Sequence, residues 1–240
     1  RGIWCVPKYS NPTGSIYSRE VTDRLVQLCV AHPNFHIFWD NAYCVHDLTD
    51  HPISIPNILK IAKQAGVENN IFIFTSTSKI TFPGGGIAML VSGKSNIAYY
   101  TSRRNLALKS GDKINQLRHV RFLKSVKNIY THMGLHRAIL RPKFQLVNNI
   151  LSDNFSNDEY IHWRIPEGGY FILLHLYPYT AKRVFEKCKQ ERVLLTQPNS
   201  IFPNRNDPWD QLIRLAPTHP SLNELEYAIT VLSNAIRSCT

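Results

Sequence analysis

The sequence predicts an α/β protein whose mostly parallel sheet is followed by a smaller α+β domain. Short runs of β-branched and aromatic residues alternate with segments of helical periodicity, which is typical of a parallel sheet with crossover helices. A long amphipathic stretch over residues 132–151 then precedes short apolar runs and a capped last helix. Because helices of this length often join two domains, we place the boundary at residue 130. The expected domains are residues 1–130 and 131–240.

The first domain opens on a strand that ends in strong turn residues. Ser18 can cap the following helix, which has an apolar face at Val21, Leu25, Leu28 and Cys29. A run of β-branched and aromatic residues at 71–75 predicts a fully buried strand. The expected elements are strands at 2–6, 35–39, 71–75 and 87–91 and helices at 19–31 and 58–64.

The second half of the chain turns helical from residue 96, with a break expected near 109–111. Pro142 should kink the long helix at 132–151. Thr180 can cap a helix, and Ser221 with Glu224 forms the capping box of the last one. The remaining expected elements are a helix at 112–124, strands at 170–176, 193–195 and 212–215, and a helix at 181–191.

Composition restricts the class of protein. The 240 residues are 43% hydrophobic and 19% charged, and no apolar run approaches the roughly 18 residues of a membrane span. No amino-terminal signal segment is recognisable, and because the first residue is Arg1 we expect a fragment or a processed chain. Five cysteines without regular spacing predict free thiols, a reducing, cytoplasmic location and no metal site. The net charge of +11 is spread along the chain, which favours small anionic ligands over nucleic acid.

A lysine follows the strand at 71–75. Ser76 and Lys79 lie just past this strand, and three glycines follow at 84–86. Open α/β sheets bind ligands at the carboxyl ends of their strands, where a lysine in a partly dry pocket can lose its charge and attack an aldehyde. Hydroxyls and glycine amides nearby suit a phosphate. For this segment alone, an ordinary exposed lysine is the competing interpretation.

Two further loops follow predicted parallel strands and also carry polar side chains. Asn11 follows the first strand, and Asp40 with Tyr43 follows the second. Because such strands end at one edge of a sheet, these residues and Ser76 with Lys79 could converge on one ligand. The set suits pyridoxal phosphate: the amine for its aldehyde, the carboxylate for its ring nitrogen, the amide and phenol for its 3-oxygen, and the hydroxyl for its phosphate.

Six stretches in order resemble the fold-type I pyridoxal phosphate aminotransferases, and the similarity is greatest to the type Ic aspartate aminotransferases, the MocR-like group. The chain resembles the carboxyl-terminal half or more of that family: part of the large cofactor-binding domain plus the small α+β domain. The stretches are residues 9–14 (YSNPTG), 40–43 (DNAY), 75–79 (TSTSK), 115–122 (NQLRHVRF), 166–171 (PEGGYF) and 213–218 (IRLAPT).

The resemblance implies a role for each matching residue. Lys79 is the Schiff-base lysine and moves the proton, Asp40 pairs with the pyridinium nitrogen, and Ser76 contacts the phosphate. Asn11 and Tyr43 bind the 3-oxygen, while Arg214 and Asn11 contact the amino-acid substrate. The implied reaction moves an amino group from an acidic amino acid, L-aspartate, to 2-oxoglutarate in a homodimeric enzyme.

The sequence departs from this pattern in two places. No arginine follows Lys79 within residues 80–87, so we expect the amides of Gly84–Gly86 to replace that phosphate contact. The family's amino-terminal half is missing, so we expect an exposed sheet edge and apolar face. Two alternatives stay open: an aminotransferase-like effector domain of a transcription regulator, and a truncated inactive copy. The basic stretch at 118–121 is either a reader of a substrate's distal carboxylate or a solvated helix face.

Overall fold

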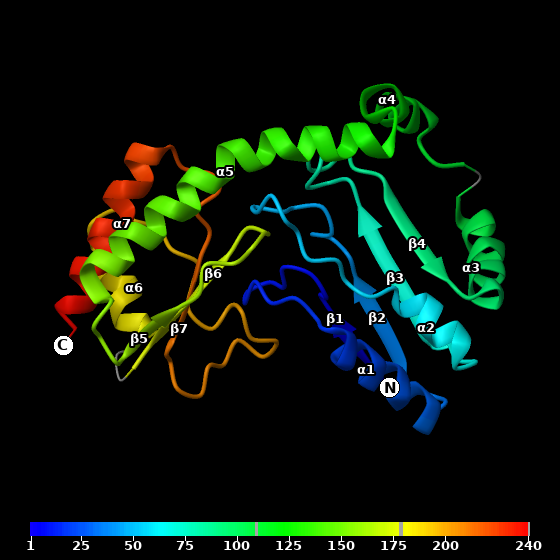
Figure 1. The fold of residues 1–240 in the computed structure, drawn as a ribbon, viewed down its shortest axis with the longest axis horizontal. Helices are drawn as coiled ribbons and strands as arrows, with labels where there is room; N and C mark the ends of the chain where they lie inside the picture. Colours follow the sequence, from blue (N-terminus) through cyan, green and yellow to red (C-terminus); the bar gives the residue numbers. More distant parts are fainter. Residues whose placement is uncertain (109, 178–179, 240) are drawn as a thin grey trace. The chain divides into compact units, whose positions relative to one another are not determined.

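The computed structural model describes residues 1–108, 110–177 and 180–239, and the chain divides into two compact units (Figure 1). The first unit comprises Arg1–Ser10, Ser15–His46 and His51–Gly134. The second comprises Asn11–Gly14, Asp47–Asp50 and Leu135–Thr240. Two short segments from the first half of the chain therefore belong to the second unit. The sequence-based boundary at residue 130 stays a prediction.

The first unit is built on a four-stranded sheet in the order β1-β2-β3-β4. The first three strands are parallel, and β4 runs antiparallel to β3. Helix α1 connects β1 to β2, and α2 lies between β2 and β3, as parallel neighbours require. This confirms the predicted α/β class. The bounds are β1 (Gly2–Cys5), α1 (Arg19–Ala31), β2 (His36–Asp40), α2 (Ile58–Gln64), β3 (Ile71–Ser76) and β4 (Ala88–Ser92).

Helices α1 and α2 cover one face of this sheet, and aromatic side chains occupy the other. The covered face forms a buried cluster of Cys5, Val26, Cys29, Ile37, Trp39, Ile58, Ala62 and Ile71. On the opposite face the ring of Trp4 stacks on Phe38 and Phe74 at 5.8 and 5.5 Å, yet Trp4 is 59% exposed. The expectation that β3 is fully buried was therefore wrong: only Ile71 is buried, because the aromatic face has no covering layer among the described residues.

The buried face of α1 agrees with the expected one only in part: Cys29 is buried and Leu25 packs against the core, as expected. The helix buries Thr22, Val26 and Cys29, whereas Val21 and Leu28 are exposed. Positions 21, 25 and 28 and positions 22, 26 and 29 have the same helical spacing of four and three residues, so the periodicity of the sequence cannot show which set is buried. The Ser18 cap was predicted correctly, since its side chain accepts a hydrogen bond from the Val21 amide.

Three further helices follow β4: α3 (Lys94–Ala107), α4 (Lys113–Leu123) and α5 (Val126–Phe155). The expected break at 109–111 falls between α3 and α4, although Lys109 itself lies outside the described residues. Helix α5 is longer than expected and continues through Pro142, with its amino-terminal part in the first unit and the rest in the second. Within the described residues, no helix is both long and apolar enough to cross a membrane.

The second unit packs helices on a three-stranded antiparallel sheet in the order β5-β6-β7. Its core joins Phe144, Val147 and Leu151 of α5 to residues of all three strands and of the last two helices. This is the predicted smaller α+β part. The bounds are β5 (Ile161–Trp163), β6 (Ile172–Leu176), α6 (Ala181–Gln190), β7 (Leu212–Leu215) and α7 (Leu222–Arg237).

Two local expectations in this unit were wrong. Residues 193–195 form no strand: Val193 packs into the core, whereas Leu194 is 80% exposed, and no neighbouring strand pairs with them among the described residues. Thr180 precedes α6 but makes no side-chain capping bond.

The five cysteines, all among the described residues, form no disulfide; Cys5, Cys29 and Cys188 are buried, and Cys44 and Cys239 are half-buried. Burial raises the pKa of Cys188 to about 11, with a further contribution from Cys239, and burial also raises the pKa of Cys5 and Cys29. Thiols of this kind are unreactive near neutral pH. They act as small apolar core residues.

The capping box of α7 predicts a pH-dependent contribution to stability. The Glu224 carboxylate accepts a hydrogen bond from the Ser221 amide at 2.7 Å, which lowers the pKa of Glu224. A lowered folded-state pKa contributes stability above the ordinary glutamate pKa of about 4.3, and this contribution is lost as the pH falls through the folded value. We expect urea unfolding to show Glu224→Gln less stable than the parent at pH 6, with the difference shrinking below about pH 4. A difference that stays constant down to pH 2.5 would contradict this.

Candidate active site

Polar side chains gather at the carboxyl edge of the parallel strands in the first unit. Strand β2 ends at Asp40, which pairs in register with Phe74 of β3, and β3 ends two residues later at Ser76. The turn after β2 carries Tyr43, and the turn after β3 carries Lys79. The Asn41 amide donates to the Phe74 carbonyl at 2.7 Å and ties the two strand ends together. The sheet thus positions these four site residues.

The carboxylate of Asp40 is oriented by two donors. One oxygen accepts from the Trp4 indole at 3.3 Å, and the other accepts from the Ala42 amide at 3.1 Å. Each carboxylate oxygen has two acceptor positions, so a further donor can still bind. Asp40 is half-buried, and the arrangement suits a protonated ring nitrogen as an additional partner.

Lys79 and Tyr43 lie against each other. The Lys79 ammonium is 5.1 Å from the centroid of the Tyr43 ring, which is within the range of a cation–π contact. Tyr43 is only 5% exposed, whereas Lys79 is an exposed residue. The described residues therefore do not supply the dry pocket that we expected around Lys79.

The turn between Lys79 and β4 is held by contacts at both ends. Thr77 exchanges two hydrogen bonds with Ile87, at 2.9 Å each, and Ser76 Oγ accepts from the Ser78 amide at 3.3 Å. From α4, the Asn115 side chain donates to the Gly85 carbonyl at 2.7 Å. The phosphate-binding roles of Ser76 and the glycine amides stay predictions.

Gly86 packs directly on the residue before Lys79, so its substitution should displace the lysine. A Cβ atom at position 86 would lie 2.7 and 2.8 Å from the Ser78 backbone N and Cα. We expect Gly86→Ala to cost about 1–3 kcal/mol of unfolding free energy, measured in urea, because backbone atoms must move. Gly84→Ala is the matched control: it meets no atom within 4 Å and has only the strain of its positive φ of 79°, about 1–2 kcal/mol. If Lys79 of the Gly86→Ala variant reacted with an aldehyde at the same rate as in the unsubstituted chain, the expected displacement would be contradicted.

The other two predicted site residues meet in the second unit. The Arg214 guanidinium donates to Asn11 Oδ1 at 2.8 Å, across 203 positions of sequence. The same guanidinium lies 4.5 Å from the centroid of the Phe171 ring. Arg214 comes from β7, and residues 11–14 join this unit by packing Gly14 against Pro166. Two residues that the sequence selected separately are thus direct partners.

Arg214 retains donor capacity. Its Nε is buried and has no hydrogen-bond partner in the described part of the chain. The residue also lines a cavity of about 710 Å³ that includes residues 193–196 and 215–217. A buried donor without a partner is costly, and a guanidinium binds a carboxylate through two parallel hydrogen bonds. The position therefore suits a carboxylate ligand.

The donor set fits the cofactor that the resemblance implies: an amine, a phenol, a carboxylate and a hydroxyl at one sheet edge. Asp40, Tyr43, Ser76 and Lys79 are together in the first unit, and Asn11 and Arg214 are together in the second. Convergence of all six on one ligand stays a prediction. The described residues include no group of three or more His, Cys, Asp or Glu that could hold a metal ion.

Several contacts of the candidate site were missed by sequence reasoning: the Trp4 indole on Asp40, the Phe171 ring on Arg214, and histidines around Lys79. Phe171 lies in the stretch 166–171, which was selected as a motif without a role for this residue. Trp4 and the histidines had no distinguishing pattern. Of the basic stretch at 118–121, His119 is buried and the other three residues are exposed, so it is not simply a solvated helix face.

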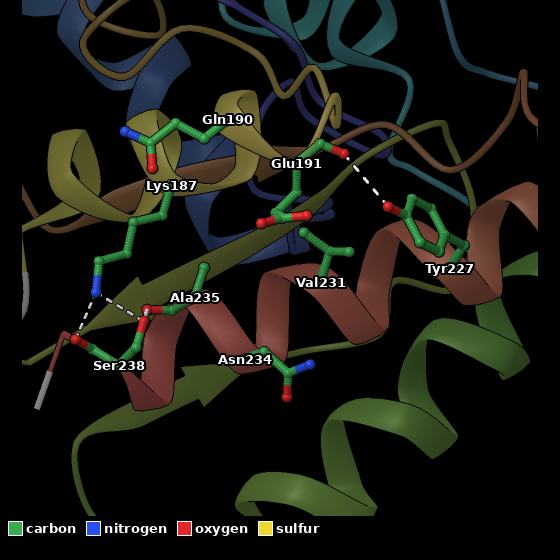
Figure 2. Close-up of a pocket in the computed structure, with 8 residues that line it drawn as sticks. All are labelled: Lys187, Gln190, Glu191, Tyr227, Val231, Asn234, Ala235 and Ser238. Carbon is green, nitrogen blue, oxygen red and sulfur yellow. Dashed lines mark hydrogen bonds between the residues drawn. The ribbon is translucent and has the colours of Figure 1, made fainter.

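A separate hollow of about 450 Å³ lies between α6 and α7 (Figure 2). Figure 2 shows Lys187 reaching Ser238 at one end, and Tyr227 donating to the Glu191 carbonyl at the other, at 3.4 Å. None of the predicted site residues lines it. Its charged side chains come from exposed helix surfaces, so this hollow provides no catalytic set.

Comparisons with known proteins identify the family and the fold of the chain. The family model described as aspartate amino-transferase matches residues 1–239. The chain is 38% identical over 236 residues to the aspartate aminotransferase of Corynebacterium glutamicum, covering 98% of this chain and 55% of that protein. The crystal structure of an aspartate transaminase from the same organism has a TM-score of 0.94 at 38% identity, covering 98% of this chain and 56% of the other.

A more distant relative is named as a transcriptional regulator and not as an aminotransferase. The HTH-type transcriptional regulator NorG of Staphylococcus aureus is 24% identical over 230 residues, which cover 95% of this chain and 49% of the regulator. The chain spans about half the length of the curated relatives it matches.

Proposed function

The chain belongs to the aspartate aminotransferase family, and from this premise we propose that it forms the catalytic part of a pyridoxal phosphate-dependent transaminase. The proposed reaction moves the amino group of an acidic amino acid, L-aspartate, to 2-oxoglutarate. Lys79 is the proposed catalytic residue. The observation that carries the proposal is the edge of the parallel sheet, where Lys79 Nζ lies over the Tyr43 ring and Asp40 ends the neighbouring strand.

The residues of the first unit have distinct proposed roles. When bound, the cofactor withdraws electrons from the substrate's α-carbon. Lys79 Nζ would hold the cofactor covalently until the substrate amine displaces it, and the released amine would then move a proton at the α-carbon. Asp40, oriented by Trp4 and Ala42, keeps a ring nitrogen protonated. Tyr43 donates a hydrogen bond to the ring oxygen, and Ser76 with the amides of residues 84–86 binds the phosphate.

The residues of the second unit bind the substrate in this proposal. Arg214 binds the α-carboxylate through its guanidinium, which Asn11 orients from one side and Phe171 from another. The resemblance implies a second role for Asn11, a hydrogen bond to the ring oxygen. The buried Nε of Arg214 supports this assignment because a bound carboxylate supplies an acceptor for it.

A direct experiment is to add pyridoxal phosphate to the purified chain, reduce with borohydride and map the modified peptide by mass spectrometry. We expect a new absorbance band and a single modified site at Lys79, both absent from Lys79→Ala. Lys63, exposed on α2, is the internal control for nonspecific modification. Equal modification of Lys63 and Lys79, or an unchanged band in Lys79→Ala, would refute the assignment.

The regulator NorG supports a second candidate function, an effector domain that binds the cofactor without turnover. Both candidates predict modification of Lys79, so the discriminating measurement is turnover. A longer parent protein that converts L-aspartate and 2-oxoglutarate to oxaloacetate and glutamate supports the transaminase. Cofactor binding with no turnover of any amino acid supports the effector domain, and no binding at all supports a truncated inactive copy.

The family resemblance also supports a homodimer working in the cytoplasm. Light scattering coupled to size-exclusion chromatography on the purified protein tests the oligomeric part of this proposal. A monomer at micromolar concentration would contradict it.

A further inference from the structure

Three histidines from three different segments contact the residues around Lys79, two through backbone carbonyls and one through a side-chain hydroxyl. His46 lies in the turn after β2, His119 in α4 and His132 in α5, and all three belong to the first unit. Each contacts a different one of three consecutive residues. The contacts are His46 Nε2 with Lys79 O at 3.1 Å, His132 Nε2 with Ile80 O at 2.8 Å, and His119 Nε2 with Thr81 Oγ1 at 3.0 Å.

The partners determine which ring nitrogens carry protons. A carbonyl oxygen only accepts hydrogen bonds, so His46 and His132 must each carry a proton on Nε2. His119 Nδ1 lies 2.9 Å from the Asn115 carbonyl, so Nδ1 carries a proton. His119 Nε2 contacts the Thr81 hydroxyl, which also lies 3.0 Å from the Thr77 carbonyl and can donate its one proton to only one of these two groups. The carbonyl contacts therefore require an Nε2 proton on His46 and His132 and an Nδ1 proton on His119.

Packing fixes the three rings. His46 and His119 are only 4% and 5% exposed, and His132 is half-buried. Each ring also contacts an aromatic neighbour, which restricts its rotation. The contacts are Tyr43 with His46 at 5.6 Å, Phe82 with His119 at 6.0 Å, and Phe122 with His132 at 5.1 Å between ring centroids.

One of these contacts is made to Lys79, the proposed catalytic residue, and the other two are made to the next two residues. His46 binds the carbonyl of Lys79 itself and packs edge-on against Tyr43, over whose ring the Lys79 ammonium lies. Ile80 and Thr81 are the next two residues, and their amides both donate to the Thr77 carbonyl. Backbone movement at residues 79–81 therefore moves Nζ relative to Tyr43.

We propose that His46, His119 and His132, hereafter the histidine clamp, are positioning residues for Lys79. The clamp fixes the backbone of residues 79–81 so that Nζ stays at the sheet edge, although Lys79 is itself exposed. This inference rests on the proposed function, since it assigns to the clamp the placement of the amine that attaches the cofactor. None of the three histidines is proposed to touch the substrate or the reacting atoms.

The first test compares His132→Leu with His132→Gln in the 240-residue chain without cofactor. Glutamine keeps an N–H donor for the Ile80 carbonyl, and leucine removes it. We expect amide hydrogen exchange at Ile80 and Thr81 to become about five- to tenfold faster in His132→Leu, the size expected for one lost hydrogen bond, and to be largely restored in His132→Gln. The control His162→Leu, at an exposed position on β5, should leave these amides unchanged.

The second test measures the rate at which pyridoxal phosphate attaches to Lys79, trapped with borohydride in the same variants. We expect a rate at least about tenfold lower in His132→Leu and rescue in His132→Gln, because small displacements of a reacting group are costly. Failure of the unsubstituted 240-residue chain to take up the cofactor would refute the proposed function. The exchange test on the same chain without cofactor would still show whether the clamp holds residues 79–81. Unchanged exchange in His132→Leu, or equal effects of leucine and glutamine, would overturn the clamp.

A third measurement needs no variant and applies even if His132→Leu fails to fold. Histidine ring nitrogens labelled with 15N report their protonation by NMR. We expect an Nε2 proton on His46 and His132 and an Nδ1 proton on His119. A ring of His46 or His132 protonated only on Nδ1 would overturn the proposal.

Discussion

Replacing Lys79 with alanine is expected to lower transaminase kcat/KM by about 10³-fold or more, because both covalent attachment and proton transfer at the α-carbon are lost. The alanine variant should fold normally, since Lys79 is exposed and its contact with His46 is made by a backbone carbonyl. The measurement is formation of oxaloacetate from L-aspartate in a coupled assay.

Lys79→Arg is the matched control for this prediction. Arginine keeps the positive charge over the Tyr43 ring but stays protonated at neutral pH, so it cannot act as a nucleophile. We expect it to be as inactive as the alanine variant. Substantial turnover in either variant would remove Lys79 from the catalytic role, and activity in arginine alone would indicate a purely electrostatic one.

Replacing Arg214 with glutamine or lysine is expected to reduce kcat/KM for the amino-acid substrate by about 100-fold, which corresponds to roughly 2.8 kcal/mol. The reason is geometric: the guanidinium is held by Asn11 at 2.8 Å and by the Phe171 ring, and its Nε faces no acceptor in the described residues. Lysine keeps the charge but cannot form two parallel bonds to a carboxylate. Steady-state kinetics with L-aspartate measures the effect.

Two further variants test whether the effect belongs to Arg214 and to its contact with Asn11. Arg183→Lys, at an exposed position on α6, should leave the kinetics unchanged. Asn11→Ala combined with Arg214→Lys should cost less than the sum of the single changes, because the two residues act through one hydrogen bond. An Arg214→Lys enzyme with parental kcat/KM, or fully additive effects, would show that this contact does not orient the substrate-binding group.

Much of the fold was accessible from local signals. The alternation of apolar runs with helical segments indicated the parallel sheet, and α1, α2 and β7 have the expected bounds. The Ser221–Glu224 capping box was predicted correctly because it depends only on residues three positions apart. Features set by neighbours in sequence are the ones that a sequence alone can specify.

Other features depended on contacts that are distant in sequence. Residues 193–195 have the composition of a strand but no partner strand among the described residues, so Val193 packs into the core as part of a loop. In α1, the expected face at 21, 25, 28 and 29 and the buried face at 22, 26 and 29 share Cys29 and have similar helical spacing, and only packing against the sheet decided that Val26 is buried and Val21 exposed. Local pattern cannot decide which of two equal faces is buried.

The candidate site also combines features that local sequence predicts with features that depend on contacts distant in sequence. The sequence by itself predicted the candidate polar groups and their positions near strand ends: Asp40 and Ser76 end parallel strands, and Tyr43 and Lys79 lie in the turns that follow. Only the tertiary structure decided what holds those groups. The Trp4 indole on Asp40, the Asn11 amide on Arg214 and the histidine clamp around Lys79 join residues between 33 and 203 positions apart. Such partners have no local signature, because a hydrogen bond depends on position in space and not on spacing in sequence.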